Sequence, residues 1–97
     1  MHNMKPIIKI IVTCLNQKIN FDPSVDDTGR EWWYISPLYV DNQDFPQIPI
    51  DELAKNIKDL KLTSIKEVST FTHFKRLFIQ IRGNREEIIK ECNKLLQ

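Results

Sequence analysis

The chain has 97 residues, 41% of them hydrophobic and 28% charged, and a formal net charge of +1. This length suits one domain, residues 1–97, with a single core, and the composition excludes an intrinsically disordered chain. No apolar run approaches the ~18 residues of a membrane span, and the balanced charge argues against a general nucleic-acid coat.

The cysteines and the N-terminal residues bear on the compartment. Cys14 and Cys92 are the only cysteines and lie far apart in the sequence. Two such thiols make no disulfide framework, so we expect them buried and reduced. The short apolar start is not followed by a small-residue cleavage site, so we expect no signal peptide. The sequence therefore predicts a soluble, cytoplasmic protein.

The first half of the chain is expected to supply two strands. Residues 5–15 carry Ile and Val on both alternating positions, which is typical of a strand covered on both faces. The alternation reaches Phe21 and ends at Pro23, and residues 26–29 are expected to form an acidic turn. Residues 31–40 predict the second strand, in which Pro37 implies an edge position or a bulge.

The second half predicts a helix, a hairpin and a closing helix. Ile50, Leu53, Ile57 and Leu60 recur at helical spacing, so residues 50–60 are expected to be an amphipathic helix. Residues 62–71 and 76–82 are expected to be strands joined by a hairpin connection at residues 72–75, although Leu62, Ile65 and Val68 at threefold spacing leave a helix open for the first of them. After Gly83, Asn84 followed three residues later by Glu87 predicts an N-cap of the closing helix.

The predicted order is therefore β-β-α-β-β-α. It indicates a two-layer α+β fold, in which a mostly antiparallel sheet carries both helices on one face. The side chains expected in the core are Ile10, Val12, Leu53, Ile57, Leu77, Ile79, Ile81, Ile88, Cys92 and Leu95.

Catalysis has little support in the residue pattern. The acidic residues near position 26 do not follow a calcium-loop spacing, and two glycines in total provide no phosphate-binding loop. A Cys14–His73 dyad is conceivable, but no local motif marks it. We predict a protein without enzymatic activity, metal or cofactor.

The adjacent tryptophans suggest a binding surface. Trp32 and Trp33 lie side by side on a predicted strand, so they must point to opposite faces of the sheet. Trp33 shares its parity with Ile35, so we expect Trp32 and Tyr34 to point outward, either to pack across strands or to meet a partner. The predicted partner-binding residues are Asp22, Asp26, Asp27, Arg30, Glu31, Trp32 and Tyr34.

A second candidate surface lies on the strand at residues 76–82. Phe78, Gln80 and Arg82 share one parity, and an aromatic ring beside polar and basic side chains can hold a single-stranded nucleic acid. The residues of this alternative site are Lys75, Arg76, Phe78, Gln80 and Arg82.

Three functions remain compatible with the sequence. The first is a small inhibitor of the toxin-immunity or antitoxin type, whose acidic rim is attracted to a basic cleft such as that of a nuclease. The second is a nucleic-acid-binding regulator. The third is a subunit that buries its open sheet face in a homodimer. We expect a protein as the partner, no membrane contact, and a monomer or a homodimer.

Overall fold

Four helices and a three-stranded sheet make up the described part of the chain, which in this computed structural model comprises residues 4–17, 31–41 and 43–97. The fold belongs to the α+β class. In chain order the elements are α1 (Lys5–Asn16), β1 (Trp32–Ile35), α2 (Pro37–Asp41), α3 (Ile50–Asp59), β2 (Ile65–His73), β3 (Arg76–Gly83) and α4 (Arg85–Leu96).

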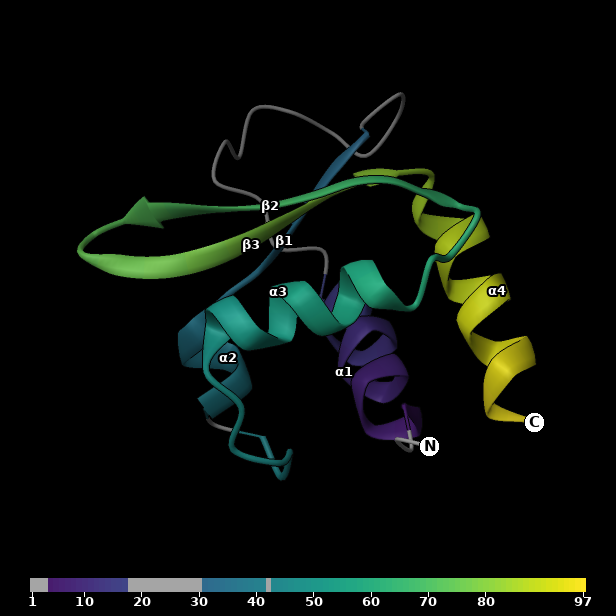
Figure 1. Cartoon of the computed structure of the whole chain (residues 1–97), viewed down its shortest axis with the longest axis horizontal. Coiled ribbons are helices and arrows are strands. Elements are labelled where there is room, and N and C mark those ends of the chain that lie inside the picture. The colour runs from purple at the N-terminus through teal and green to yellow at the C-terminus, as the bar shows by residue number, and fades with distance from the viewer. Residues whose placement is uncertain (1–3, 18–30, 42) are drawn as a thin grey trace.

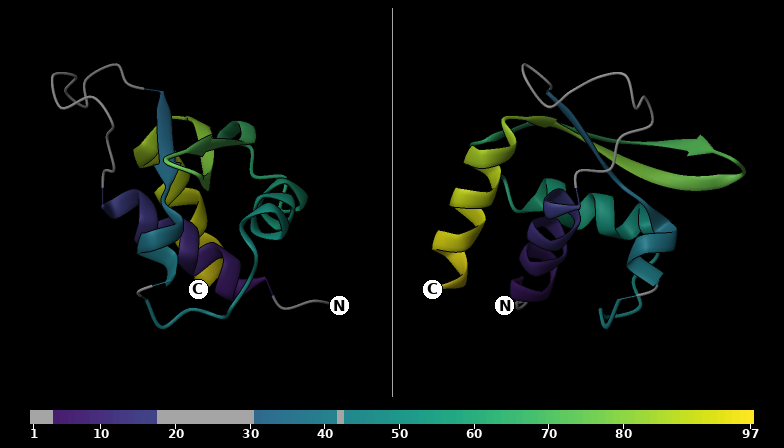
Figure 2. Two further views of the ribbon diagram at one scale, coloured as in Figure 1. Left: turned by 90° about the vertical axis from the view of Figure 1, so that its left-hand side faces the viewer. Right: turned by 180° about the vertical axis from the view of Figure 1, so that it is seen from behind.

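The sheet is antiparallel, with β3 between β1 and β2. Trp33 lies opposite Ile81 on one side of β3, and Val68 lies opposite the same residue on the other side. Figures 1 and 2 show α1, α3 and α4 on one side of the sheet, and the β2–β3 hairpin extending to one end of the molecule. A mostly antiparallel sheet with its helices on one face is therefore confirmed, but the prediction of two such helices is wrong, because α1 adds a third.

The predicted first strand is wrong, because residues 5–16 form α1. Ile7, Ile8, Ile11, Cys14 and Leu15 are all buried, and their separations of one, three, three and one residues trace one wide face of a helix. A helix that is buried over so wide a face has apolar residues at both odd and even positions, and a strand covered on both faces has the same pattern. Its length of 12 residues and the proline in its first turn are typical of a helix.

The predicted second strand is too long. β1 ends at Ile35, and α2 begins at Pro37, where the fixed φ of proline suits the first turn of a helix. The backbone N–H of Val40 donates to the carbonyl of Ser36 at 3.1 Å. The predicted order β-β-α-β-β-α is thus replaced by α-β-α-α-β-β-α. The expected turn at residues 26–29 lies outside the described residues.

The elements predicted after residue 50 are confirmed to within a few residues. Phe74 and Lys75 form the two-residue hairpin turn, and their φ values of 50° and 63° are those of a type I′ turn. The backbone N–H of Glu87 donates to the side-chain oxygen of Asn84 at 3.0 Å, so Asn84 caps α4.

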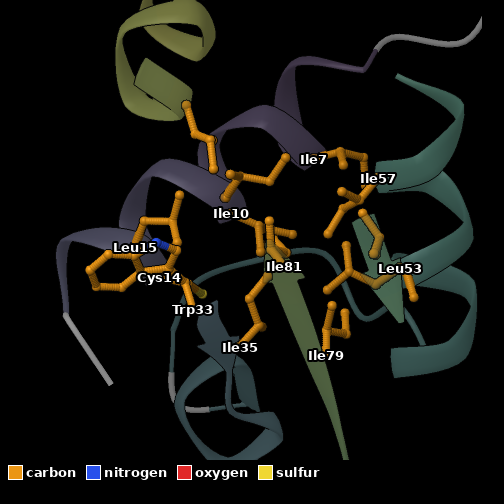
Figure 3. Close-up of a cluster of buried hydrophobic side chains, with 14 of the residues drawn as sticks. Ile7, Ile10, Cys14, Leu15, Trp33, Ile35, Leu53, Ile57, Ile79 and Ile81 are labelled. Carbon is orange, nitrogen blue, oxygen red and sulfur yellow. The ribbon is translucent and has the colours of Figure 1, made fainter. Parts of the chain in front are cut away.

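The core lies between the sheet and its three helices, where isoleucine predominates (Figure 3). Of the ten side chains predicted to be buried, three are not: Val12 and Leu77 are only partly buried, and Leu95 is 48% exposed. α4 buries Ile88 and Cys92, and Leu95 lies beside this line. The other seven are confirmed as buried, namely Ile10, Leu53, Ile57, Ile79, Ile81, Ile88 and Cys92. Among the helices of the described ranges, none has the length and apolarity needed to cross a membrane.

Candidate functional site

The sheet face turned away from α1, α3 and α4, here called the outer face, carries residues of both predicted sites. Trp32 of β1 lies opposite Arg82 of β3, and Tyr34 lies opposite Gln80. The protein-binding set and the nucleic-acid-binding set were predicted as separate surfaces, and the register joins them into one. The outer face consists of Trp32, Tyr34, Glu67, Ser69, Phe71, His73, Arg76, Phe78, Gln80 and Arg82.

Trp33 points the other way, as predicted, and is only 3% exposed. Its indole Nε1–H donates to the carbonyl oxygen of Gly83 at 3.0 Å, and the guanidinium of Arg85 lies 5.7 Å from the ring centre. A Cβ atom on Gly83 would collide with the backbone carbonyl oxygen of Ser64. Glycine is therefore required at the position that receives the indole hydrogen bond. The two tryptophans thus have separate roles: Trp33 completes the core, and Trp32 belongs to the outer face.

Aromatic rings form a continuous row across the outer face. The ring centres of Tyr34 and Phe71 lie 5.6 Å apart in an edge-to-face arrangement. The rings of Phe71 and Phe78 are stacked, with their centres 5.6 Å apart and 25° between the planes. His73 contacts Phe78 at 5.6 Å in an edge-to-face arrangement and so extends the row toward the hairpin tip. Phe78 is 7% exposed, whereas Tyr34 and Phe71 are partly exposed. Such ring pairs are among the favoured cross-strand contacts of sheets.

Charged side chains gather at the Trp32 end of this row. The Arg82 guanidinium lies 3.9 Å from the Glu31 carboxylate and 3.8 Å from that of Glu67. Lys66 lies 3.8 Å from the same Glu31. These side chains are 35–57% exposed, so each pair contributes at most about 1 kcal/mol. Their combined effect is to balance the charge of Arg82 with two carboxylates.

The contacts of the predicted nucleic-acid-binding residues are those of a packed sheet face. Phe78 is covered, so its ring offers no open platform for stacking a base. The Gln80 amide donates to the Ser69 hydroxyl at 2.7 Å, and Arg82 is paired as described. Lys75 and Arg76 lie at the hairpin tip and are exposed.

The outer face also contains residues that the sequence reasoning missed, above all Phe71, Ser69 and Glu67 of β2. Part of their signal was present, because a strand over residues 62–71 and a hairpin connection at residues 72–75 are predicted there. The structure shortens that connection to two residues and thereby sets Phe71 opposite Phe78. Four of the predicted partner-binding residues, Asp22, Asp26, Asp27 and Arg30, lie outside the described residues. Glu31 is exposed at the start of β1.

The conceivable Cys14–His73 pair is not assembled. Cys14 is fully buried among the helices, where desolvation raises the pKa of its thiol to about 12, and His73 lies on the outer face. Burial, and secondarily the charge of Glu91, raises the pKa of Cys92 to about 11. Within the described ranges, no three His, Cys, Asp or Glu side chains are grouped to hold a metal ion.

Comparison of the chain with protein-family models, with curated proteins and with solved structures finds no match. The function is therefore inferred from the geometry of the outer face itself.

Proposed function

We propose that the protein is a non-catalytic binding module that holds another protein against its outer face. The observation that carries the proposal is the position of Trp32, Tyr34 and Phe71, which lie partly exposed beside a group of balanced charges. Large aromatic side chains next to arginine are the composition most enriched in the energetic centres of protein interfaces.

The same contacts favour a protein over a nucleic acid as the partner. Nucleic-acid binding draws its affinity from uncompensated basic side chains along the phosphate backbone. On the outer face, Glu31 and Glu67 flank Arg82 at 3.9 and 3.8 Å, and each would repel a phosphate brought to that guanidinium. A protein partner can satisfy both signs of charge.

The more specific role that we propose is a cytoplasmic inhibitor of the toxin-immunity or antitoxin type. Asp22, Asp26 and Asp27 precede Glu31 in the sequence and add three negative charges to the segment that leads into β1. Such negative charge attracts a basic cleft, such as the substrate groove of a nuclease, and accelerates the encounter. The buried, unpaired thiols of Cys14 and Cys92 suit a reducing compartment.

The test is affinity capture from the native host, followed by kinetics on the retained protein. Replacing Trp32 or Tyr34 by alanine should accelerate dissociation, by ~30-fold if the residue is a central anchor. Charge reversal by Asp26→Lys and Asp27→Lys should mainly slow association and weaken its salt dependence. The matched control is Leu95→Ala, which removes an exposed apolar side chain from α4.

Retention of the same protein with unchanged rates by the Trp32→Ala and Tyr34→Ala variants would refute the proposal. Loss of binding in the Leu95→Ala variant as well would point to a different face.

A further inference from the structure

The second surface of interest is the free edge of β2, which is the last strand on its side of the described sheet. The hairpin turn has two residues, so His73 and Arg76 form its closing hydrogen-bonded pair. Hydrogen-bonded and non-hydrogen-bonded pairs alternate along an antiparallel ladder. The backbone groups of Val68, Thr70 and Thr72 therefore point away from β3, toward the edge.

An independent hydrogen bond supports this assignment. If Arg76, Phe78, Gln80 and Arg82 turn their backbone groups to β2, the intervening residues of β3 must turn theirs to the other side. Gly83 does so, because its N–H donates to the carbonyl of Glu31 at 2.8 Å. The outward set on β2 follows from the same alternation.

The middle of this edge lacks the usual features that prevent strand addition. Natural sheets protect a long edge with lysine, proline, inward charges or bulges. β2 has an irregularity between Ile65 and Glu67, but residues 68–73 contain neither proline nor a lysine or carboxylate. Three consecutive outward-directed residues, each with one N–H and one C=O, thus offer six backbone positions to an added strand.

The two ends of the edge are basic. Where β2 begins, a groove of about 180 Å³ runs between it and α3, with an apolar floor and charged walls. Where β2 ends, the exposed Lys75 and Arg76 flank the hairpin tip. Glu67 and Lys66 are also paired toward the outer face, with Arg82 and Glu31, so Lys58 and Lys61 give the groove its net positive charge. The groove is lined by Ile57, Leu62, Ile65 and Val68 and by Lys58, Lys61, Lys66 and Glu67.

We propose that the β2 edge is a strand-addition site for an extended, acidic segment of another polypeptide. Backbone hydrogen bonds to Val68, Thr70 and Thr72 would provide the part of the affinity that does not depend on the side chains of the added segment. Acidic side chains at the two ends of the segment would meet the lysines of the groove and the basic tip. The backbone groups of this edge and the side chains of Trp32 and Tyr34 lie on opposite sides of β3, so the two proposals can fail separately.

A second copy of the chain fits the edge less well. Antiparallel self-pairing that uses all three outward residues places Thr70 opposite Thr70 and Lys66 opposite Phe74 of the second copy. Lys75 and Arg76 of that copy then approach the end of the edge where the basic groove lies. Like charges opposed in this way disfavour the pairing. An acidic segment removes this conflict.

The experiment uses the whole chain and fluorescein-labelled synthetic octapeptides that alternate valine with glutamate, or valine with lysine. Fluorescence anisotropy should show binding of the glutamate peptide that weakens with salt, and at least 10-fold weaker binding of the lysine peptide. Thr70→Pro removes one outward N–H that takes no part in the β3 ladder, and should weaken binding at least 10-fold. Thr70→Val keeps that N–H and is the matched control.

Further variants test the charged ends and separate the two proposals. Lys58→Glu with Lys61→Glu should weaken binding of the glutamate peptide about 10-fold and reduce its salt dependence, whereas Lys94→Glu on α4 should not. Trp32→Ala should leave the affinity for the peptide unchanged. If Thr70→Pro disrupts folding, a glutamate peptide N-methylated on alternate residues tests the backbone contacts with the unaltered protein.

Equal binding of the two peptides, absence of binding at millimolar peptide, or full affinity for both N-methylated registers would overturn the proposal. So would a concentration-dependent dimer in sedimentation that Thr70→Pro dissociates, because the occupant would then be a second copy.

Discussion

The inner and outer faces of one sheet are built from the same three strands and have different chemistry. The inner face presents Trp33, Ile35, Ile79 and Ile81, each at most 3% exposed. The alternate residues of those strands form the outer face. Its contacts are a row of aromatic rings, a hydrogen bond from the Gln80 amide to the Ser69 hydroxyl, and exposed ion pairs of Arg82. Because successive side chains of a strand point to opposite faces, a change of one position moves a residue from one chemistry to the other.

The two faces differ in how much they contribute to folding. Burial of the inner face removes apolar surface from water, and this is the main stabilising term of a small domain. Apart from the buried ring of Phe78, the contacts on the outer face are polar or partly solvated, so each contributes less to folding. Substitutions on the inner face should therefore change stability, and those of the partly exposed residues on the outer face should change binding.

The neighbouring tryptophans give the largest predicted effect. Trp33→Ala should lower the free energy of unfolding by about 3–5 kcal/mol, because it leaves a cavity and deprives the Gly83 carbonyl of its donor. Trp32→Ala should cost roughly 1 kcal/mol, as expected for a partly buried surface residue. Urea denaturation of the two variants measures both values. Equal losses would mean that the two faces contribute alike to folding.

Local sequence signals predicted the second half of the fold and failed in the first. The hairpin, α3 and the cap at Asn84 each depend on residues close together in the chain, and the structure confirms them. In α1 the β-branched composition suggested a strand, although Ile7, Ile11 and Cys14 recur at helical spacing. The polar residues Lys5, Lys9, Thr13 and Asn16 also recur at helical spacing and trace the less buried side of α1, but the run of β-branched residues between them outweighed this signal.

More than half of the outer face could be predicted from the sequence in the same way. Strand parity correctly separated Trp33 from Trp32, because Ile35 lies two residues from Trp33. Placing Phe71 against Tyr34 requires knowing that β1 pairs with β3, a contact between residues about 50 positions apart. No turn or short connection specifies that pairing, so it is decided by the packing of the whole chain.

A carboxylate that lies on neither face of the sheet gives a predicted effect on stability of intermediate size. Glu91 of α4 accepts hydrogen bonds from the backbone N–H groups of Thr63 (3.0 Å) and Ser64 (2.9 Å) and from both hydroxyls. It thereby fixes the turn that leads into β2. Partial desolvation raises the pKa of Glu91, but the bonds from Ser64 and Thr63 outweigh it, and the net effect is a pKa below the ordinary value.

This lowered pKa sets a direction for the pH dependence. The unfolded chain binds the proton of Glu91 more readily than the folded chain, so protonation favours unfolding. The stabilisation is complete above the unfolded pKa, near 4.3, and is lost as the pH falls through the folded value. Glu91→Gln should cost about 1–2 kcal/mol at pH 7, and this difference should shrink at pH 3.

Urea denaturation at the two pH values measures the effect of Glu91→Gln. Glu87→Gln on the same helix is the matched control, because only its backbone N–H takes part in the N-cap bond. A pH-independent loss would show that the Glu91 side chain acts through packing and not through its charge.

The smallest effect on stability is expected at Arg82, the centre of the charged group. Its carboxylate partners lie 3.8–3.9 Å away and are about half exposed, so solvent screens the attraction. Arg82→Gln should change the free energy of unfolding by less than about 0.5 kcal/mol, and high salt should reduce even that difference. Arg82→Lys, which keeps the charge, is the control in the same denaturation series. A loss above 2 kcal/mol for Arg82→Gln would mean that the outer face holds the sheet together, and the separation of stability from recognition between the two faces would then be wrong.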